Sequence, residues 1–314
     1  MKRRILRAGV LLAAILAVGC AAASVPPVAP ARTASAVEAA VEAGARLCAC
    51  RLGIAARHLE SDRSYEHNAS ERFEAASVVK IAVLTEAMAG VREGRIDLSE
   101  RWTLSASSKA SESGWLKLFD AGLNPTWNDL LTLMIGPSDN TATNAWIERL
   151  GLDRINARME SLGFREIRLL SILPWLDKSQ SGPRWEGLKF GVVTPRDVAE
   201  WLSRVARGEL LDAESSRRIF QYLDASPSRS RLARRFPSAD LWAGKTGTMA
   251  GVRNDAGILR TAKGRFVLVV FTGESPEANE SAPTHPAAIA MGEIARAIVE
   301  EWSRDLPDLT GAPR

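Results

Sequence analysis

The sequence runs Phe73-Glu-Ala-Ala-Ser77-Val-Val-Lys80 and continues into an apolar, helically spaced segment that reaches residue 91. This spacing predicts a helix over 78–91 that starts at Ser77, with Lys80 on the same face one turn later. The free N–H groups and positive potential of a helix N-terminus favour an oxyanion beside such a serine. A serine hydroxyl is a weak nucleophile until a base takes its proton. No histidine is placed to do so, which leaves Lys80 as the candidate base.

Two further motifs follow downstream, Ser138-Asp-Asn140 and Lys245-Thr-Gly247. Each motif is weak alone, but all three in this order and context are expected by chance in fewer than about one chain in a hundred. Ser138 could relay a proton to a leaving nitrogen. Asn140 could hold a substrate amide, cap the helix that follows it, or do both.

The third motif explains how Lys80 could act as a base. A lysine accepts a proton near neutral pH only if its pKa is lowered, and both burial and a nearby cation such as Lys245 would lower it. The motif is expected to end a strand, where Gly247 lets a substrate backbone lie close. The N–H groups of Thr248 and Ser77 would then form an oxyanion hole.

Strand patterns lie at both ends of the chain, with helical patterns between them. Periodicity and capping signals predict helices over 33–45, 78–91, 127–133, 141–150, 152–162, from Thr194-Pro195 onward, 212–223 and 286–303. Alternation and turn signals predict strands over 47–57, 64–68, 241–245, 252–260 and 265–272, and residues 170–193 read as a long loop. This segregation indicates an α+β fold, with an antiparallel sheet covered by helices.

Five segments follow from this pattern. We expect a signal peptide at 1–20, a tether at 21–34, an α/β lobe from 35–80 and 194–303 that shares one antiparallel sheet, a helical lobe with an omega-like loop at 81–193, and a tail at 304–314. A cleft between the two lobes is a natural place for a site.

The N-terminus reads as an export signal. Basic residues precede an apolar stretch over 8–18 that is too short to span a bilayer comfortably. Ala17-Val-Gly-Cys20 is similar to a bacterial lipoprotein box in which Cys20 carries the lipid, and ordinary cleavage within 21–25 is the alternative. Both interpretations place the protein in the periplasm or cell envelope, with membrane contact only through a lipid at Cys20.

The charge distribution does not indicate a nucleic-acid partner. The net charge is +4, and the densest basic groups are Arg217-Arg218 and residues 229–235. These groups read as a solvated face, and no basic stripe interleaved with aromatics is present.

The cysteines and histidines do not indicate a metal or redox site. Cys48 and Cys50 would point to one face of the predicted strand, which favours two small buried side chains over a disulfide or a redox pair. No spacing typical of metal ligands is present, so neither a metal nor another cofactor is expected.

Taken together, the three motifs resemble the serine β-lactamase and penicillin-binding protein superfamily, and most closely the class A β-lactamase-like serine hydrolases, over about residues 35–303. Residues 138–144 are similar to the family's extended helix-start segment, and Thr194-Pro195 resembles the pair that closes its omega loop. Arg253 lies where an arginine often anchors the substrate carboxylate. The resemblance implies a two-lobed fold, an acyl-enzyme on Ser77, catalytic roles for Lys80, Ser138 and Lys245, and substrate contacts from Asn140, Thr246, Gly247, Thr248 and Arg253.

The segment before Thr194 departs from the family pattern. Class A enzymes carry an omega-loop Glu, preceded by Arg-Trp, that activates the deacylating water. Arg184-Trp-Glu186 is present here, but Pro195 follows after about half the family's interval. Asp177 has a better interval in an unmatched context. Glu186 and Asp177 are therefore candidate deacylation bases, and ordinary surface carboxylates are the alternative. Trp115 lies near the family's cleft-wall aromatic and could equally be a core residue.

Three functions compete. The favoured one is hydrolysis of β-lactams through an acyl-Ser77 intermediate. The second is a D,D-peptidase or esterase of the same fold that β-lactams acylate but that deacylates them poorly. The third is a non-catalytic cell-wall-binding lipoprotein, which the intact Ser77, Lys80 and Ser138 argue against. The expected partner is a small β-lactam or a peptidoglycan-like peptide, and the chain is expected to be a monomer.

Overall fold

The structure, a computed structural model, describes residues 35–110, 112–172, 184, 186–226, 228–237, 240–276 and 282–309. All of them belong to one compact unit, Ala34–Arg314. The predicted signal peptide, Cys20 and the tether, as well as Asp177, fall outside the described residues. None of the helices in the described ranges has the length and hydropathy needed to cross a membrane.

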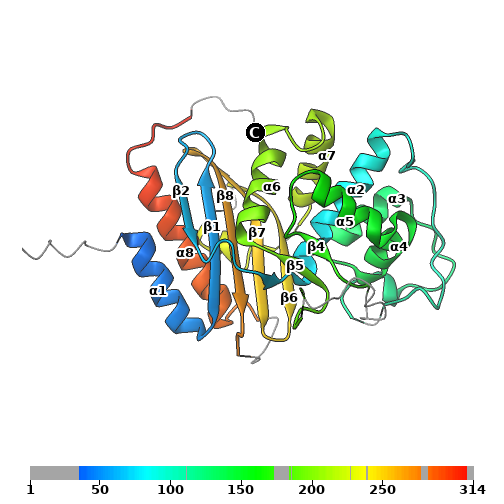
Figure 1. The fold of residues 1–314 in the computed structure, drawn as a ribbon, viewed down its shortest axis with the longest axis horizontal. Coiled ribbons are helices and arrows are strands. Elements are labelled where there is room, and N and C mark those ends of the chain that lie inside the picture. Colours follow the sequence, from blue (N-terminus) through cyan, green and yellow to red (C-terminus); the bar gives the residue numbers. More distant parts are fainter. Residues whose placement is uncertain are drawn as a thin grey trace, which may run out of the picture. The chain divides into compact units, whose positions relative to one another are not determined.

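A five-stranded sheet lies at the centre of this unit, in the order β2-β1-β8-β7-β6 (Figure 1). Every neighbouring pair is antiparallel. The strands are β1 (Arg51–His58), β2 (Ser64–His67), β6 (Leu241–Met249), β7 (Val252–Thr261) and β8 (Gly264–Gly273). Strands from the two ends of the chain therefore share one sheet, and the predicted α+β class is confirmed.

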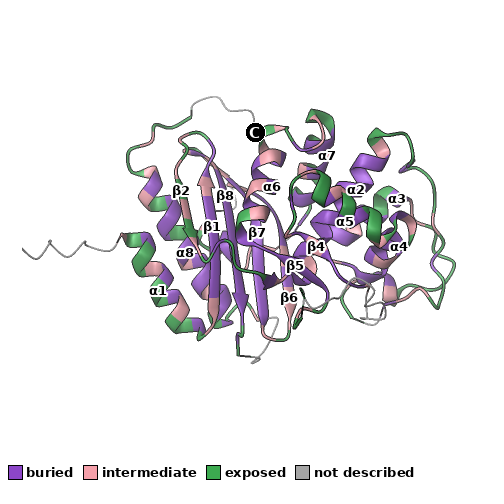
Figure 2. Cartoon of the chain, in the orientation of Figure 1, coloured by how far each residue is buried: buried purple, intermediate pink, exposed green. Residues whose placement is uncertain are grey.

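β8 shows why both faces of the sheet are buried. Val267, Val269 and Phe271 belong to one apolar cluster, whereas Leu268 and Val270 belong to another. Since successive side chains of a strand point to opposite faces, each cluster lies on its own side of the sheet. Figure 2 shows the central strands buried almost throughout, while the outer sides of the flanking helices are exposed.

Helices cover both faces. α1 (Ala36–Cys48) and α8 (Pro286–Ser303) supply side chains to the cluster that contains Leu268, and α2 (Lys80–Arg92) and α6 (Pro195–Arg207) supply side chains to the other. α2 is buried on all sides from Lys80 to Gly90, which explains why its sequence has no polar face. The remaining α-helices are α3 (Trp127–Ile135), α4 (Asn140–Leu150), α5 (Leu152–Ser161) and α7 (Ala213–Asp224).

The predicted loop over 170–193 ends in a strand. Gly191–Val193 form β5, which pairs with β3 (Phe73–Glu74) and β4 (Arg168–Leu169) in a small second sheet. A strand of three residues is too short to show alternation, so no sequence pattern predicts it. Thr194 then begins α6 as predicted, because its hydroxyl accepts a hydrogen bond from the N–H of Asp197 and proline follows it.

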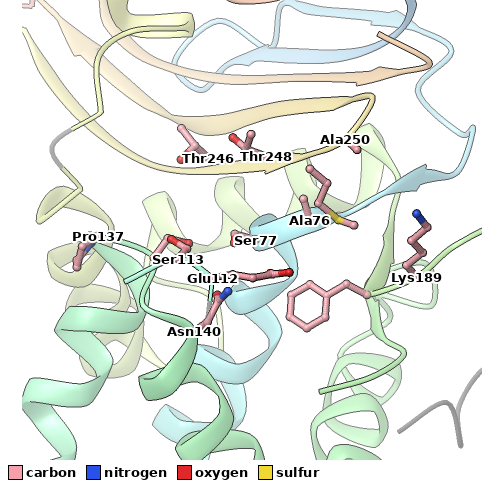
Figure 3. A pocket seen from close by; sticks show the side chains of 14 residues that line it. Ala76, Ser77, Glu112, Ser113, Pro137, Asn140, Lys189, Thr246, Thr248 and Ala250 are labelled. Atoms are coloured by element: carbon pink, nitrogen blue, oxygen red, sulfur yellow. The ribbon is translucent and has the colours of Figure 1, made fainter. Parts of the chain in front are cut away.

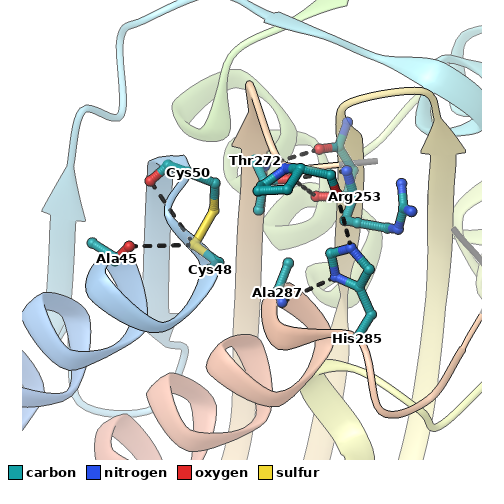
Figure 4. The surroundings of a disulfide bond; sticks show 9 residues. Ala45, Cys48, Cys50, Arg253, Thr272, His285 and Ala287 are labelled. Carbon is teal, nitrogen blue, oxygen red and sulfur yellow. Dashed lines mark hydrogen bonds between the residues drawn. A yellow bond between two sulfur atoms is a disulfide. The ribbon is translucent and has the colours of Figure 1, made fainter. Parts of the chain in front are cut away.

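The interpretation of Cys48 and Cys50 as two unlinked buried side chains is wrong, because they form a disulfide (Figure 4). α1 continues to Cys48 rather than giving way to a strand at residue 47. Ala49 adopts a left-handed conformation with φ 47° and turns the chain back. The turn brings the two Cα atoms to 5.1 Å, within the range that a disulfide requires.

The sequence predicted that the Lys-Thr-Gly motif would end its strand, and this prediction is wrong. β6 runs on to Met249, and Thr246 and Thr248 pair with Asp255 and Arg253 of β7. The chain turns at Gly251, where φ is 71°. The motif therefore lies along an edge strand of the sheet, where successive residues face opposite sides of the sheet.

Candidate active site

Ser77 lies in a single turn of 3-10 helix, Ala76–Val79, that leads directly into α2. The residue before it, Ala76, has a positive φ of 45°, a conformation that costs a non-glycine residue free energy and is often found at functional sites. Asn254 of β7 holds the preceding backbone, because its side-chain amide donates to the carbonyl oxygens of Glu74 and Ala75 at 2.8 and 3.2 Å. The turn that presents Ser77 is thus fixed by the neighbouring sheet.

Lys80 is fully buried and contacts the second motif. Its Nζ lies 2.8 Å from the carbonyl oxygen of Ser138, 3.0 Å from the Ser138 hydroxyl and 2.8 Å from Oδ1 of Asn140. Burial lowers the pKa of Lys80 well below its usual value, and the positive charge of Lys245 lowers it further. The first and second motifs therefore meet around a buried amine whose pKa is lowered.

Asp139 holds Ser138 in position. Its buried carboxylate accepts hydrogen bonds from the N–H groups of Trp115, Leu116 and Ala142 at 2.6, 2.8 and 2.9 Å. Ser138 itself has a φ of 60°. Because the carboxylate ties the start of α4 to the segment around Trp115, it stabilises this unusual backbone. No role for Asp139 was predicted from the sequence.

Lys245 reaches the same hydroxyl from the sheet. Its Nζ lies 3.1 Å from the Ser138 hydroxyl and 2.9 Å from the carbonyl oxygen of Thr246. Burial lowers the pKa of Lys245 to about 7, with a further contribution from the positive charge of Arg231, while Asp255 acts in the opposite direction. The Ser138 hydroxyl thus stands between two buried lysines.

A cavity of about 670 Å³ opens over this cluster (Figure 3). Its lining includes Ser77, Ser138, Asn140, Thr246 and Thr248 from the predicted site. The lining also contains residues that the sequence did not single out, namely Ala76, Glu112, Ser113, Gly136, Pro137, Lys189, Phe190, Met249 and Ala250. The described residues contain no group of three or more side chains suited to hold a metal ion.

Gly247 permits the close approach of β6 to the serine turn. A Cβ atom at this position would lie 2.8 Å from the carbonyl oxygen of Ala75 and 3.2 Å from the backbone nitrogen of Ser77. The first of these contacts is shorter than real Cβ atoms show, so any larger residue must push β6 away from Ser77.

We expect Gly247→Ala to slow the acylation of Ser77 about 10- to 100-fold and to destabilise the fold by about 1–3 kcal/mol. The displaced strand would carry the N–H of Thr248 away from the serine. Gly273→Ala is the matched control, since a Cβ there meets only the flexible end of Arg51. Acylation rates and thermal unfolding would be measured for both variants, and equal acylation rates would contradict this account.

Besides Lys80, Lys245 and Gly247, which lie behind the lining, three further predicted residues are not part of it. Glu186 is exposed, and the residues of its segment that line the cavity are instead Lys189 and Phe190. Trp115 is 58% exposed and lies outside the lining. Arg253 is buried, and its guanidinium donates to the carbonyl oxygens of Met249 and Val252 at 2.9 and 2.8 Å.

Arg231 is a buried residue that the sequence did not reveal. Its guanidinium donates to the carbonyl oxygens of Gly247 and Asn254 and to the hydroxyl of Thr248. The interpretation of 229–235 as a solvated face is therefore wrong for this residue, which is 9% exposed. A dense run of arginines gives no sign of which member turns inward, because the pattern is the same for all of them.

The comparisons with known proteins agree with this geometry. A family model described as the Beta-lactamase enzyme family matches residues 34–302. A crystal structure of a beta-lactamase from Sphaerobacter thermophilus is 32% identical, with TM-score 0.74, over 87% of this chain and 98% of that one. A beta-lactamase from Streptomyces lavendulae is 28% identical over 214 residues, 66% of this chain and 68% of its own.

A mutant of PBP-A, solved as an acyl-enzyme complex with penicillin G, has the same fold, with TM-score 0.71 and 24% identity over 85% of this chain and 96% of that one. The family model spans nearly all of the described residues, and the solved structures show the same arrangement of sheet and helices. The chain belongs to the Beta-lactamase enzyme family.

Proposed function

We propose that the protein is a serine hydrolase that forms an acyl-Ser77 intermediate, and that its substrates are β-lactams. The observation that carries this proposal is the Ser138 hydroxyl between two buried lysines, at 3.0 and 3.1 Å, in the cavity that Ser77 lines. Among the described residues no carboxylate contacts either lysine directly, so burying both amines costs folding free energy. Such perturbed groups cluster at functional sites, which favours catalysis over a purely structural role.

Acylation can be written with these groups alone. Neutral Lys80 takes the proton of the Ser77 hydroxyl, and Oγ attacks the carbonyl carbon of the β-lactam. The N–H groups of Ser77 and Thr248 stabilise the oxyanion. As the tetrahedral intermediate collapses and the ring C–N bond breaks, the Ser138 hydroxyl gives its proton to the leaving nitrogen. Ser138 recovers a proton from one of the two lysines beside it.

The neighbours of Lys80 suit the neutral amine. The carbonyl oxygen of Ser138 and Oδ1 of Asn140 can only accept hydrogen bonds, and a neutral amine has two N–H groups to offer them. The ammonium that forms when Lys80 takes a proton has a third N–H group, which donates to the Ser138 hydroxyl at 3.0 Å. Lys245, by contrast, contributes most as an ammonium, which donates to that hydroxyl and attracts an anionic substrate.

The acylation rate should fall at high pH, and the midpoint of this fall, the alkaline limb of the pH profile, should shift in opposite directions in two variants. Lys245 loses its proton as the pH rises through about 7, so acylation should fall above that pH. Arg231→Gln removes a cation that lowers this pKa, and the limb should move up by about 0.5–1 pH unit. Asp255→Asn removes an opposing anion, and the limb should move down by a similar amount.

The sign of the second shift depends on the charge of Asp255. Burial raises its pKa to about 6, so the carboxylate is ionised where the limb lies. An asparagine Oδ1 can still accept the 3.0 Å hydrogen bond from the N–H of Leu232, which keeps the local fold. Second-order acylation constants between pH 5 and 10 would measure both shifts, and movement in the same direction would contradict the assignment of the limb to Lys245.

A poorly deacylating D,D-peptidase is the second candidate, and one observation favours it. Glu112 is the sole carboxylate among the described residues that line the cavity, and it comes from a segment distant in sequence from the predicted omega-like loop. A water that attacks the acyl-enzyme needs a base close to Ser77. Because the predicted omega-like loop places no described carboxylate in the cavity lining, slow deacylation is the expected consequence. The structure of the PBP-A mutant shows that penicillin G is held as an acyl-enzyme on this fold in that protein.

One experiment separates the three functions. Intact-protein mass spectrometry after addition of benzylpenicillin should show a mass increase of one penicillin, which then decays if the enzyme turns over. A single burst with nitrocefin followed by a persistent adduct would identify the peptidase. If no β-lactam or ester labels the wild-type protein, the result would support non-catalytic binding to the cell wall.

We also propose export to the periplasm or cell envelope, with Cys20 as a lipid anchor, which metabolic labelling with a fatty acid would test.

A further inference from the structure

We propose that the part of the cavity between Asn140 and Lys189 is a zwitterion site, in which Glu112 binds an ammonium and Lys189 binds a carboxylate of the substrate's acyl side chain. The inference rests on the proposed acylation of Ser77. It narrows the substrate class to β-lactams or peptides whose acyl side chain ends in an α-amino acid group.

The reacting atoms fix the direction in which a substrate lies. With the carbonyl carbon at Ser77 and its oxygen between the N–H groups of Ser77 and Thr248, the leaving nitrogen faces Ser138. The acyl side chain then extends past Asn140. Glu112 borders that route, because the carbonyl oxygen of the adjacent Ser113 accepts a 2.9 Å hydrogen bond from the N–H of Asn140.

Lys189 borders the same route from another element. The carboxylate of Glu74 accepts hydrogen bonds from the N–H groups of residues 189, 190 and 191, the last two at 3.2 and 3.1 Å. These contacts fix the backbone of Lys189 through β3, two residues before the serine turn. Figure 3 shows Glu112 and Lys189 entering the cavity from different sides, and both belong to its lining.

Among the described residues, the side chains of Glu112 and Lys189 form no ion pair, with each other or with a third side chain. Charged neighbours contact only their backbones, because the Lys117 ammonium donates to the carbonyl oxygen of Glu112 and the Glu74 carboxylate accepts from the N–H of Lys189. The charge of Glu112 reaches the interior, where it opposes the lowering of the pKa of Lys80. A ligand that carries both charges would complement this part of the cavity, whereas a singly charged ligand would meet one attractive and one repulsive group.

Three cephalosporins that differ only at the end of one acyl chain test this directly. The aminoadipoyl compound carries both charges, the adipoyl compound carries the carboxylate alone, and the δ-aminovaleryl compound carries the ammonium alone. Second-order constants for Ser77 acylation would be measured by intact mass. Acylation is read directly, so slow deacylation does not obscure the result. Benzylpenicillin serves as a reference without either group.

We expect the aminoadipoyl compound to acylate about fivefold faster than either singly charged one, a size typical of solvent-exposed ion pairs. Glu112→Gln should abolish its advantage over the adipoyl compound, and Lys189→Gln its advantage over the δ-aminovaleryl compound. Each rate is divided by that of benzylpenicillin in the same variant, so an effect of Glu112→Gln through the pKa of Lys80 cancels in the ratio. Glu160→Gln, an exposed glutamate of α5 outside the cavity lining, should leave all ratios unchanged.

Two results would overturn the proposal in different ways. If benzylpenicillin acylates Ser77 but the ratios are the same in wild type, Glu112→Gln and Lys189→Gln, the zwitterion site is excluded and the proposed function stands. If no β-lactam acylates Ser77 at all, the proposed function fails, and this inference fails with it.

Discussion

Ser77→Ala will abolish covalent labelling by benzylpenicillin and reduce any turnover of β-lactams by about 10⁴-fold or more. The reason is that the proposed mechanism uses the Ser77 hydroxyl oxygen, and no other, as the nucleophile. The Ser138 hydroxyl is close by, but it already accepts hydrogen bonds from the Nζ atoms of Lys80 and Lys245 at 3.0 and 3.1 Å, which suits the proton transfer proposed for it. Intact-protein mass spectrometry is the measurement, with the mass increase expected in wild type and absent in the variant.

The control for this experiment is Ser107→Ala. Ser107 is an exposed serine outside the cavity lining, so its loss should leave the labelling rate unchanged. Both variants should keep the wild-type melting temperature, because a missing hydroxyl at a cavity surface leaves no buried group unpaired. Peptide mapping would locate the adduct, and labelling of Ser77→Ala at any other residue would refute the mechanism.

The fold was predictable to the extent that each element has a period long enough to be seen. The helix over 286–303 is found with the predicted bounds, because its capping signals and amphipathic pattern agree. The short strand Gly191–Val193 was missed, since three residues show no period. The end of α1 was misplaced by three residues, and this error led directly to the wrong interpretation of Cys48 and Cys50.

The site was predictable only where chemistry and sequence order coincide. Ser77, Lys80, Ser138 and Lys245 could be named because their types and spacings form a recognisable set, and the contacts among the last three are those expected. Arg231 and Asp255 could not, because their role depends on which face of an element turns inward. The same limit applies to Glu112 and Lys189, which only the folded chain brings to one cavity.

Lys80→Met should lower the acylation rate constant about 10³-fold, and Lys80→Arg should be equally impaired. The arginine comparison separates two roles for the lysine. A guanidinium keeps the positive charge but does not lose a proton in proteins, whereas burial lowers the pKa of Lys80, as the proposed role of base requires. If the lysine served only as a cation, the arginine variant would keep a substantial part of the activity.

Folding must be measured alongside, because each variant disturbs a buried cluster. Methionine leaves the carbonyl oxygen of Ser138 and Oδ1 of Asn140 without the amine, at a cost of about 1–3 kcal/mol for each unpaired acceptor, and it also removes the desolvation cost of a buried charge. The pH profile gives a readout that stability does not affect. In the wild type, acylation should fall on the acid side as Lys80 gains a proton, and this limb should be absent from the residual activity of Lys80→Met. An unchanged acid limb in that variant would show that another group is the base, and the amine at the start of α2 would then have to be assigned to holding Ser138 in place.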